Sequence, residues 1–306
     1  MRYQTPIRYP GGKQRLAGFI SELMTENKLT GGHYVEPFAG GAGVAIDLLL
    51  SGKVAHIHLN DSAVPLYAFW RSVLVHTEEF CRRVASTALT VDEWRRQKEI
   101  LSRHAAHSQI DVGFSFFYLN RCNRSGIVWR GSLIGGLDQS GKWKMDARFP
   151  RNELARRIEA IAERRGAITI KNWDAERFIM DYIPKLPAKT LVYCDPPYYR
   201  AGHLYLNNYN REDHARIAKL IQERLRRPWL VSYDNVAAVI TNYHGCQFFR
   251  YRLQYNAATV YRGAELFVFS NKLRLPTAST VRPIDKALRR FHRRQTSDAE
   301  RDYVIA

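Results

Sequence analysis

The chain has 306 residues, 45% hydrophobic and 12% aromatic, which describes a folded globular protein with a sizeable core. Its 47 Lys and Arg against 29 Asp and Glu give a formal net charge of +18, which favours a polyanionic partner such as nucleic acid. The four cysteines lack C-x-x-C spacing, no apolar run can span a bilayer, and no signal-peptide pattern opens the sequence. We therefore expect no disulfide framework, no zinc site, no membrane anchor, and a cytoplasmic protein that associates with the nucleoid through its charge.

The first motif in chain order is Arg8-Tyr-Pro-Gly-Gly-Lys13, ahead of an expected amphipathic helix over residues 14–27. The paired glycines let the backbone approach a ligand closely, and Lys13 adds a point charge. The G-x-x-x-x-G-K-[ST] pattern is absent, so triphosphate hydrolysis is poorly supported. Lys13 is placed instead to meet a ligand carboxylate.

A strand over residues 33–36 is followed by the glycine-rich turn Pro-Phe-Ala-Gly40-Gly-Ala-Gly43 and a helix over residues 44–50. The next strand, residues 54–59, ends at Asn60-Asp61. An acid roughly 20 residues beyond a glycine turn commonly holds ribose hydroxyls. The pair favours an adenosine-containing cofactor over an ordinary turn with an Asp helix cap, although the G-x-G-x-x-G spacing itself is absent.

Residues 62–161 show no strand alternation and are expected to form a helical insertion. Helices are expected over residues 62–75, 90–104, 111–122 and 152–165. A long loop rich in Gly, Ser, Arg and Trp follows the third helix, and its composition suits contacts to phosphates and base edges better than a merely solvated basic loop. The DNA-contact candidates in this region are Arg121, Asn123, Arg124, Arg130, Lys142 and Lys144.

The sheet resumes with a strand over residues 167–170, which leads through Asp174 into a helix over 175–182. A second strand, residues 191–194, ends in Asp195-Pro-Pro-Tyr198. Pro196 and Pro197 cannot donate to a sheet ladder, so the strand stops there and presents Asp195 at its carboxyl end, where open α/β sheets bind ligands.

This arrangement suits a planar amine. The lone pair of an exocyclic amino group is delocalised into its ring, which makes the nitrogen a poor nucleophile. A carboxylate and a backbone carbonyl that both accept its N–H bonds would draw the nitrogen towards tetrahedral geometry, while Tyr198 stacks on the ring. A strand end with a surface tyrosine is the plainer alternative.

The polar and aromatic segment 203–209 is expected to form a mobile lid, and it offers Asn207 and Asn208 as further DNA contacts. Beyond it we expect a helix over residues 211–226, a strand over 229–234 and a short helix over 236–243. An antiparallel pair over residues 247–255 and 265–270 closes the sheet, and a basic appendage follows.

These motifs, in this order, resemble the Dam-type (D12 class) DNA adenine N6-methyltransferases over roughly residues 5 to 271. The resemblance implies an α/β fold: a Rossmann-like sheet that binds S-adenosylmethionine, with an inserted, mainly helical target-recognition domain. The catalytic domain would comprise residues 1–61 and 162–275, the insertion residues 62–161, and the appendage residues 276–306.

Carried over by position, the resemblance implies a catalytic set that binds a flipped adenine: Asp195, Pro196 with its carbonyl, Pro197 and Tyr198. It also implies that Tyr9 and Lys13 contact the methionine end of the cofactor, that Asp61 holds the ribose and that Asp174 reads the adenine amino group. The full cofactor-binding set is Tyr9, Lys13, Glu36, Phe38, Ala39, Gly40, Asp61 and Asp174. No metal is implied. Double-stranded DNA is the expected partner, and we expect a monomer.

The segment after Leu119-Asn-Arg121 departs from the Asn-Gly-rich segment of the GATC-methylating members, which leaves the recognised sequence open, together with any cognate restriction enzyme. Cytosine N4, RNA and a protein glutamine are alternative planar-amine substrates, although the charge and the insertion argue against protein. A catalytically silent DNA-binding relative, such as a repressor, is an alternative from another class. The three acids at strand ends argue against it.

Overall fold

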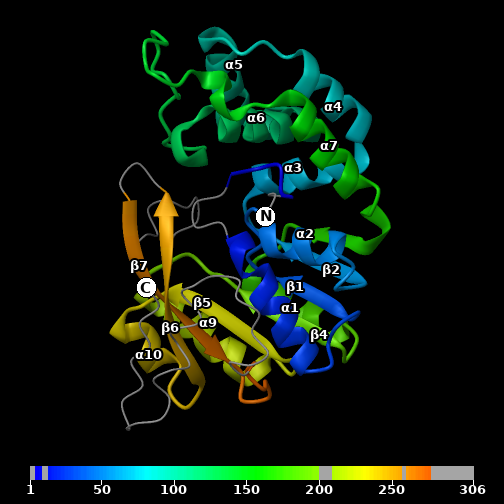
Figure 1. Cartoon of the computed structure of the whole chain (residues 1–306), viewed down its shortest axis with the longest axis vertical. Helices are drawn as coiled ribbons and strands as arrows, with labels where there is room; N and C mark the ends of the chain where they lie inside the picture. Colours follow the sequence, from blue (N-terminus) through cyan, green and yellow to red (C-terminus); the bar gives the residue numbers. More distant parts are fainter. Residues whose placement is uncertain (1–3, 9–12, 200–208, 257–259, 277–306) are drawn as a thin grey trace.

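A computed structural model of the chain describes residues 4–8, 13–199, 209–256 and 260–276. Its centre is a seven-stranded mixed sheet with helices on both faces, and further helices gather at one end of the molecule (Figure 1). The strands are β1 (His33–Glu36), β2 (His56–Asn60), β3 (Ile168–Lys171), β4 (Thr190–Cys194), β5 (Trp229–Asp234), β6 (Gln247–Asn256) and β7 (Val260–Phe269). The helices are α1 (Ala17–Glu26), α2 (Gly43–Leu50), α3 (Val64–Val75), α4 (Thr77–Ser86), α5 (Val91–Ser102), α6 (Gln109–Cys122), α7 (Arg151–Ala162), α8 (Ala175–Arg177), α9 (Arg211–Arg224) and α10 (Ala237–Asn242).

The strand order is β3-β2-β1-β4-β5-β7-β6, with β1 to β5 parallel and the β6–β7 hairpin antiparallel to β5. The chain winds outward from β1 to β3 on one side and from β4 to β5 on the other. The carboxyl ends of β1 and β4 therefore meet at the point where the winding reverses, which is where sheets of this kind bind ligands. Glu36 ends β1 and Asp195 follows β4 at this point.

Alternate residues of the central strands supply two cores. Tyr34 and Leu191 pack on the face covered by α1 and α2, whereas Val35 and Val192 pack on the face covered by α9. All four side chains are fully buried, as continuous apolar runs in a parallel sheet require. Packing on both faces fixes the position of each strand end. It therefore also fixes the carboxyl edge of the sheet, which carries the acids and which we call the rim.

The longer elements of the segment between β2 and β3 are all helices, α3 to α7 (Figure 1). Its aromatic rings, among them Phe69 and Phe117 stacked with centroids 5.9 Å apart, join the same core cluster as the α1 face of the sheet. Gly113 lets α6 approach α3, because a Cβ there would lie 2.6 Å from the Ala68 carbonyl oxygen. The recognition role and the domain boundaries of this segment remain predictions.

The predicted strands and the closing antiparallel pair are confirmed, with ends that differ by a few residues. The expected helix over 175–182 is α8 followed by a wider π-helical turn, Phe178–Tyr182. Thr90 caps α5 by accepting from the Glu93 amide, and the Glu93 carboxylate pairs with Arg96. Within the residues that the structure describes, no helix is long and apolar enough to cross a membrane.

Candidate active site

Asp195 lies directly beyond β4 and is held by a hydroxyl from β5. Ser232 Oγ donates to Asp195 Oδ1, and Ser232 Oγ also lies 2.8 Å from the Tyr193 hydroxyl on β4. The Ser232 side chain is fully buried, whereas the Asp195 side chain is 25% exposed. The Asp195 carboxylate is therefore held in place by a buried hydroxyl and is still partly exposed to solvent.

Lys13 comes to the same carboxylate from the first helical turn of the described chain. Its ammonium lies 3.4 Å from Asp195 Oδ1 and 3.4 Å from Glu265 Oε1, and it donates to the Tyr198 hydroxyl. The Nζ atom is also 4.5 Å from the centre of the Tyr198 ring. Lys13 and Glu265 are both almost completely buried, so this ion pair is shielded from water.

The Pro-Pro turn keeps Tyr198 and Tyr199 in fixed positions. The Tyr199 amide donates to Asp234 Oδ1 over 2.9 Å, and the Tyr199 ring stacks on His214 with centroids 4.8 Å apart. Tyr198 is buried in this structure. The four residues of the predicted catalytic motif are thus brought together with Lys13 at the end of β4.

Two further acids lie at the ends of β1 and β2. Burial, with repulsion from Asp195, raises the pKa of Glu36 to about 8. Burial also raises the pKa of Asp61, although its carboxylate accepts from the backbone amides of Gly40 and Ala63, each over 3.0 Å.

Asn60 holds the glycine turn against these acids. Its amide nitrogen donates to the carbonyls of Pro37 and Trp173, and its amide oxygen accepts from the Trp173 amide, all over 3.0 Å. The Ala39 amide donates to the Asn60 carbonyl over 2.8 Å. One buried side chain therefore ties together the carboxyl ends of β1, β2 and β3.

The remaining cofactor candidates surround this turn. Phe38 is partly exposed and packs edge-to-face on Tyr209 with centroids 6.1 Å apart. Asp174 is exposed, and its Oδ1 caps α8 by accepting from the amides of Glu176 and Arg177.

The donor set of this rim fits S-adenosylmethionine. Glu36 suits an ammonium group, Asp61 with the Gly40 backbone suits a ribose, and an exposed Asp174 oxygen suits an amino group on adenine. The structure pairs Lys13 with Asp195 and Glu265, and its contact with the methionine carboxylate remains a prediction.

The predicted DNA contacts divide into two groups. Arg124, Arg130, Lys142 and Lys144 are exposed, and Trp143 between the two lysines is 65% exposed. Gln139 organises this part of the loop, since its side chain bonds the backbone of Ile134, Gly136 and Met145. The exposed side chains are therefore presented on a defined loop.

Asn123 and Arg121 are buried instead. The Asn123 side chain accepts from Trp94 Nε1 over 2.8 Å and donates to the Ile127 carbonyl over 2.8 Å. These bonds give Asn123 a structural part in shaping the loop, which the composition of the loop did not indicate. Its DNA contact and that of Arg121 are untested.

Hydrogen bonds join the loop to the N-terminal segment. Asn120 Oδ1 accepts from the Arg8 amide over 2.7 Å, and Asn120 Nδ2 donates to the carbonyls of Arg8 and Gly126. Gly126 has φ +73°, and a Cβ there would lie 2.4 Å from the Arg8 carbonyl oxygen. Only glycine fits at this contact.

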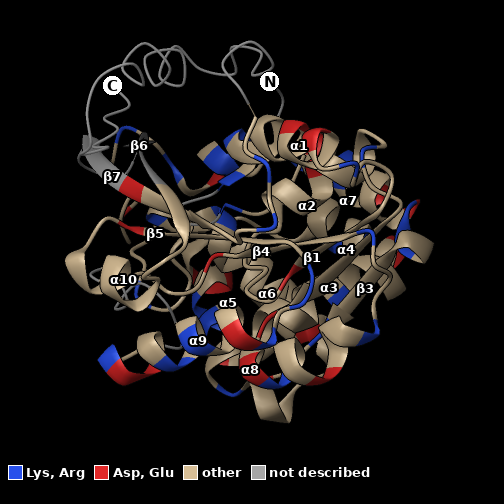
Figure 2. Ribbon diagram, turned by 90° about the horizontal axis from the view of Figure 1, so that it is seen from below, with Lys and Arg blue, Asp and Glu red and all other residues tan. Residues whose placement is uncertain are grey.

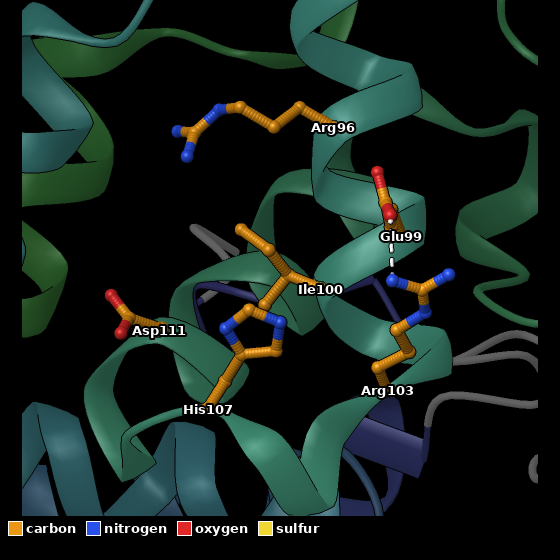
Figure 3. A pocket seen from close by; sticks show the side chains of 6 residues that line it. All are labelled: Arg96, Glu99, Ile100, Arg103, His107 and Asp111. Atoms are coloured by element: carbon orange, nitrogen blue, oxygen red, sulfur yellow. Dashed lines mark ion pairs between the residues drawn. The ribbon is translucent and has the colours of Figure 1, made fainter.

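A groove on the helical segment is a second candidate by shape, and Figure 3 shows the side chains that line it: Arg96, Glu99, Ile100, Arg103, His107 and Asp111. Its charges are largely paired within the protein: Arg103 with Glu99, Arg96 with Glu93, and Asp111 with Arg83. Basic and acidic residues are spread over many elements (Figure 2). The groove therefore has no chemistry comparable to that of the strand ends.

Three contributors were missed from the sequence: Ser232, Glu265 and Asn60 as a brace. A signal existed for Glu265, because it is the one acid in the apolar run Glu265-Leu-Phe-Val-Phe269. Tyr9, Asn207, Asn208 and most of the basic tail lie outside the described residues. No group of His, Cys, Asp and Glu suited to a metal ion occurs among the residues that were placed.

The sheet order, the glycine turn and the acids at the ends of β1, β2 and β4 define a Rossmann-like methyltransferase. A family model for the D12 class N6 adenine-specific DNA methyltransferases matches residues 9–264, and the chain belongs to this family. It is accordingly an adenine-specific DNA methyltransferase, with DNA as substrate and a methyl donor as co-substrate. A search of curated proteins found no match.

Proposed function

We propose that this enzyme transfers a methyl group from S-adenosylmethionine to the N6 amino group of an adenine flipped out of duplex DNA. The observation that supports this most is the fixed Asp195 carboxylate. Its contacts with Ser232 and Lys13 both use Oδ1, and among the described residues Oδ2 accepts no hydrogen bond. Oδ2 is therefore available for an N–H of the target amine.

The residues around Asp195 orient the base. Oδ2 accepts one N–H, the Pro196 carbonyl accepts the other, and the Tyr198 ring replaces the stacking that the base loses. Both acceptors favour the nitrogen as it becomes cationic, which is electrostatic stabilisation by groups already in place. The amine then releases one N–H proton, and S-adenosylhomocysteine is the leaving group. Asp-Pro-Pro-Tyr would equally seat cytosine N4, and the family assignment favours adenine.

The rim between β1 and β2 holds the donor. Bound S-adenosylmethionine supplies a methyl group made electrophilic by its positive sulfur. Glu36 would hold the methionine ammonium, Asp61 and the Gly40 backbone would hold the ribose, and Asp174 would read the adenine amino group. Phe38 and Ala39 line this part of the site.

The exposed loop residues Arg124, Arg130, Lys142 and Lys144 contact the duplex. A monomeric enzyme that acts on DNA in the cytoplasm stays a prediction. A cognate restriction enzyme stays a prediction.

The test is transfer of labelled methyl from S-adenosylmethionine to duplex DNA, followed by digestion to nucleosides. Label in N6-methyladenine supports the proposal. Label on cytosine would leave the proposed mechanism in place but make cytosine N4 the target. An enzyme that binds S-adenosylmethionine without labelling DNA directs the search to RNA, and loss of cofactor binding as well leaves a silent DNA-binding protein.

A further inference from the structure

Arg121 is a buried cation for which the described part of the chain supplies no counter-ion. It lies in the last turn of α6, it is 7% exposed, and its Nε atom finds no hydrogen-bond acceptor among the residues that were placed. No Asp or Glu among the residues that the structure describes forms an ion pair with it. A buried guanidinium normally has such a partner, because removing it from water is costly.

The charges nearest to Arg121 are also positive. Burial, followed by repulsion from Arg8, Arg157 and Arg148, lowers the pKa of Arg121 to about 9, which still leaves it protonated at pH 7. Burial and repulsion from Arg148 lower the pKa of Arg8 as well. Arg157 is partly neutralised by Glu153, whose Oε1 accepts from its Nη2 over 2.5 Å. We call Arg8, Arg121, Arg148 and Arg157 the arginine cluster.

Hydrogen bonds and ring packing near the four arginines hold the segments of the cluster together. Asn120, next to Arg121, bonds both the amide and the carbonyl of Arg8. Arg157 Nη1 on α7 donates to the Thr5 carbonyl over 3.1 Å. Phe149, next to Arg148, packs edge-to-face on Phe117 of α6 with centroids 5.6 Å apart. Four segments thus place four guanidinium groups in one region, and Glu153 is the only acid that forms an ion pair with any of them among the described residues.

We propose that the arginine cluster is a phosphate-binding site and that its occupant is a phosphodiester of the DNA backbone. Guanidinium groups bind phosphate oxygens in pairs, and a phosphate supplies the acceptors that Arg121 lacks. This inference rests on the proposed function for the source of the phosphate. Inorganic phosphate shares the same chemistry, so the experiment must separate the two sources.

Such a contact would link DNA binding to the catalytic centre. Arg8 lies five residues before Lys13, which bonds Asp195 and Tyr198. A phosphate that bridges Arg8 and Arg121 would fix the N-terminal segment against α6. Backbone binding would then help to position Lys13.

The first measurement is thermal unfolding of the full chain in chloride and in inorganic phosphate at equal ionic strength, without cofactor or DNA. At a phosphate concentration ten times its Kd, we expect Tm of the wild type to rise by about 3 °C. Arg121→Met should lose this rise and, in chloride, melt no lower than the wild type, because it removes an unpaired buried charge.

Two further variants guard against misfolding. Arg148→Gln changes an exposed member of the cluster and should halve the phosphate effect or remove it. Arg151→Met is the matched control: Arg151 donates to the carbonyls of Val84 and Thr87, so its loss should lower Tm and leave the phosphate effect unchanged.

The second measurement is duplex DNA affinity against salt concentration. Arg121→Met should bind about tenfold more weakly, and the slope of log Kd against log salt should fall by about one. Phosphate protection with unchanged DNA binding would overturn DNA as the source and leave a free-phosphate site. No protection and an unchanged slope would overturn the site itself. Neither the Tm measurement nor the DNA-binding measurement uses methyl transfer, so both are independent of whether the proposed reaction is observed.

Discussion

The ammonium of Lys13 lies 3.4 Å from the Asp195 carboxylate and equally far from the Glu265 carboxylate. Glu265 is opposite Asp234 in the antiparallel pairing of β5 and β7. One buried cation therefore joins the acid at the end of β4 to the returning strand of the sheet, and the closing hairpin is part of the candidate active site.

Asp195→Ala should lower methyl transfer by about 10³-fold, because the acceptor of the target amine is lost. Binding of S-adenosylmethionine should change little, since the cofactor candidates other than Tyr9 and Lys13 lie at the ends of β1 and β2 and beyond β3. Equilibrium binding and labelled transfer measured on the same preparation test both statements. Asp181→Ala, which changes an exposed acid paired with Arg177, is the control. Transfer at the wild-type rate by Asp195→Ala would remove Asp195 from the mechanism.

Glu265→Gln should lower the free energy of unfolding by about 3 kcal/mol, because it removes one of the two carboxylates from a buried ammonium. Denaturant unfolding measures the change. Glu99→Gln, which breaks an exposed pair with Arg103, should cost less than about 0.5 kcal/mol. Equal small losses in the two variants would show that the Lys13–Glu265 pair contributes nothing to stability.

The stacked histidines His33, His56 and His58 should make the fold sensitive to acid. Burial, with repulsion from His56 and His33, lowers the pKa of His58 to about 3, below its ordinary value of 6.5. The unfolded chain therefore binds a proton that the folded chain does not between pH 6.5 and about 3. Stability from His58 is complete above pH 6.5 and is lost as the pH falls, by about 2 kcal/mol at pH 5.

His58→Gln should remove that part of the pH dependence, measured as the free energy of unfolding between pH 5 and 7. Glu36 acts in the opposite direction, because its raised pKa makes stability fall as the pH rises from about 4.5 to 8. The comparison of variant with wild type isolates the histidine. His107→Gln, at an exposed position, serves as control, and an identical slope for His58→Gln and wild type would count against the assignment.

Arg124→Gln and Arg130→Gln should each weaken DNA binding or relax the choice of site, since both side chains are exposed on the organised loop. A phosphate contact would appear as a salt slope lower by about one, and a base contact as a loss of about 1–3 kcal/mol of discrimination at one position. Sequencing of methylated sites and binding at several salt concentrations separate these outcomes. An unchanged pattern in both variants would remove the loop from the recognition surface.

Gly126→Ala should lower the free energy of unfolding by roughly 2 kcal/mol, because a Cβ at positive φ would collide with the Arg8 carbonyl oxygen. Gly166→Ala is a suitable control, since nothing lies within 4 Å of a Cβ there. Unfolding in denaturant compares the two. Equal stability of the two variants would show that the N-terminal segment can move away from the loop without cost.

The sequence was sufficient for the strand ends and their acids, because an apolar run that stops at Asp-Pro-Pro is visible in one dimension. It was not sufficient for Ser232 or for the Lys13–Glu265 pair, since residues 252 positions apart meet only when the hairpin folds back onto β5. The burial of Asn123 was equally hidden, because its partner Trp94 lies on a different helix. Composition describes such a loop as polar without showing which polar groups face inward.

The bonds from Asn120 to Arg8 also bear on how recognition can be exchanged between relatives. A graft that replaces the whole stretch from the end of α6 to α7 would remove the partners of the N-terminal segment together with the exposed reading residues. A graft that begins after Gly126 would leave those partners in place. The sequence preference of this enzyme is therefore best altered within the outer part of the loop, with Asn120 and Gly126 at its base retained so that the loop stays bonded to the N-terminal segment.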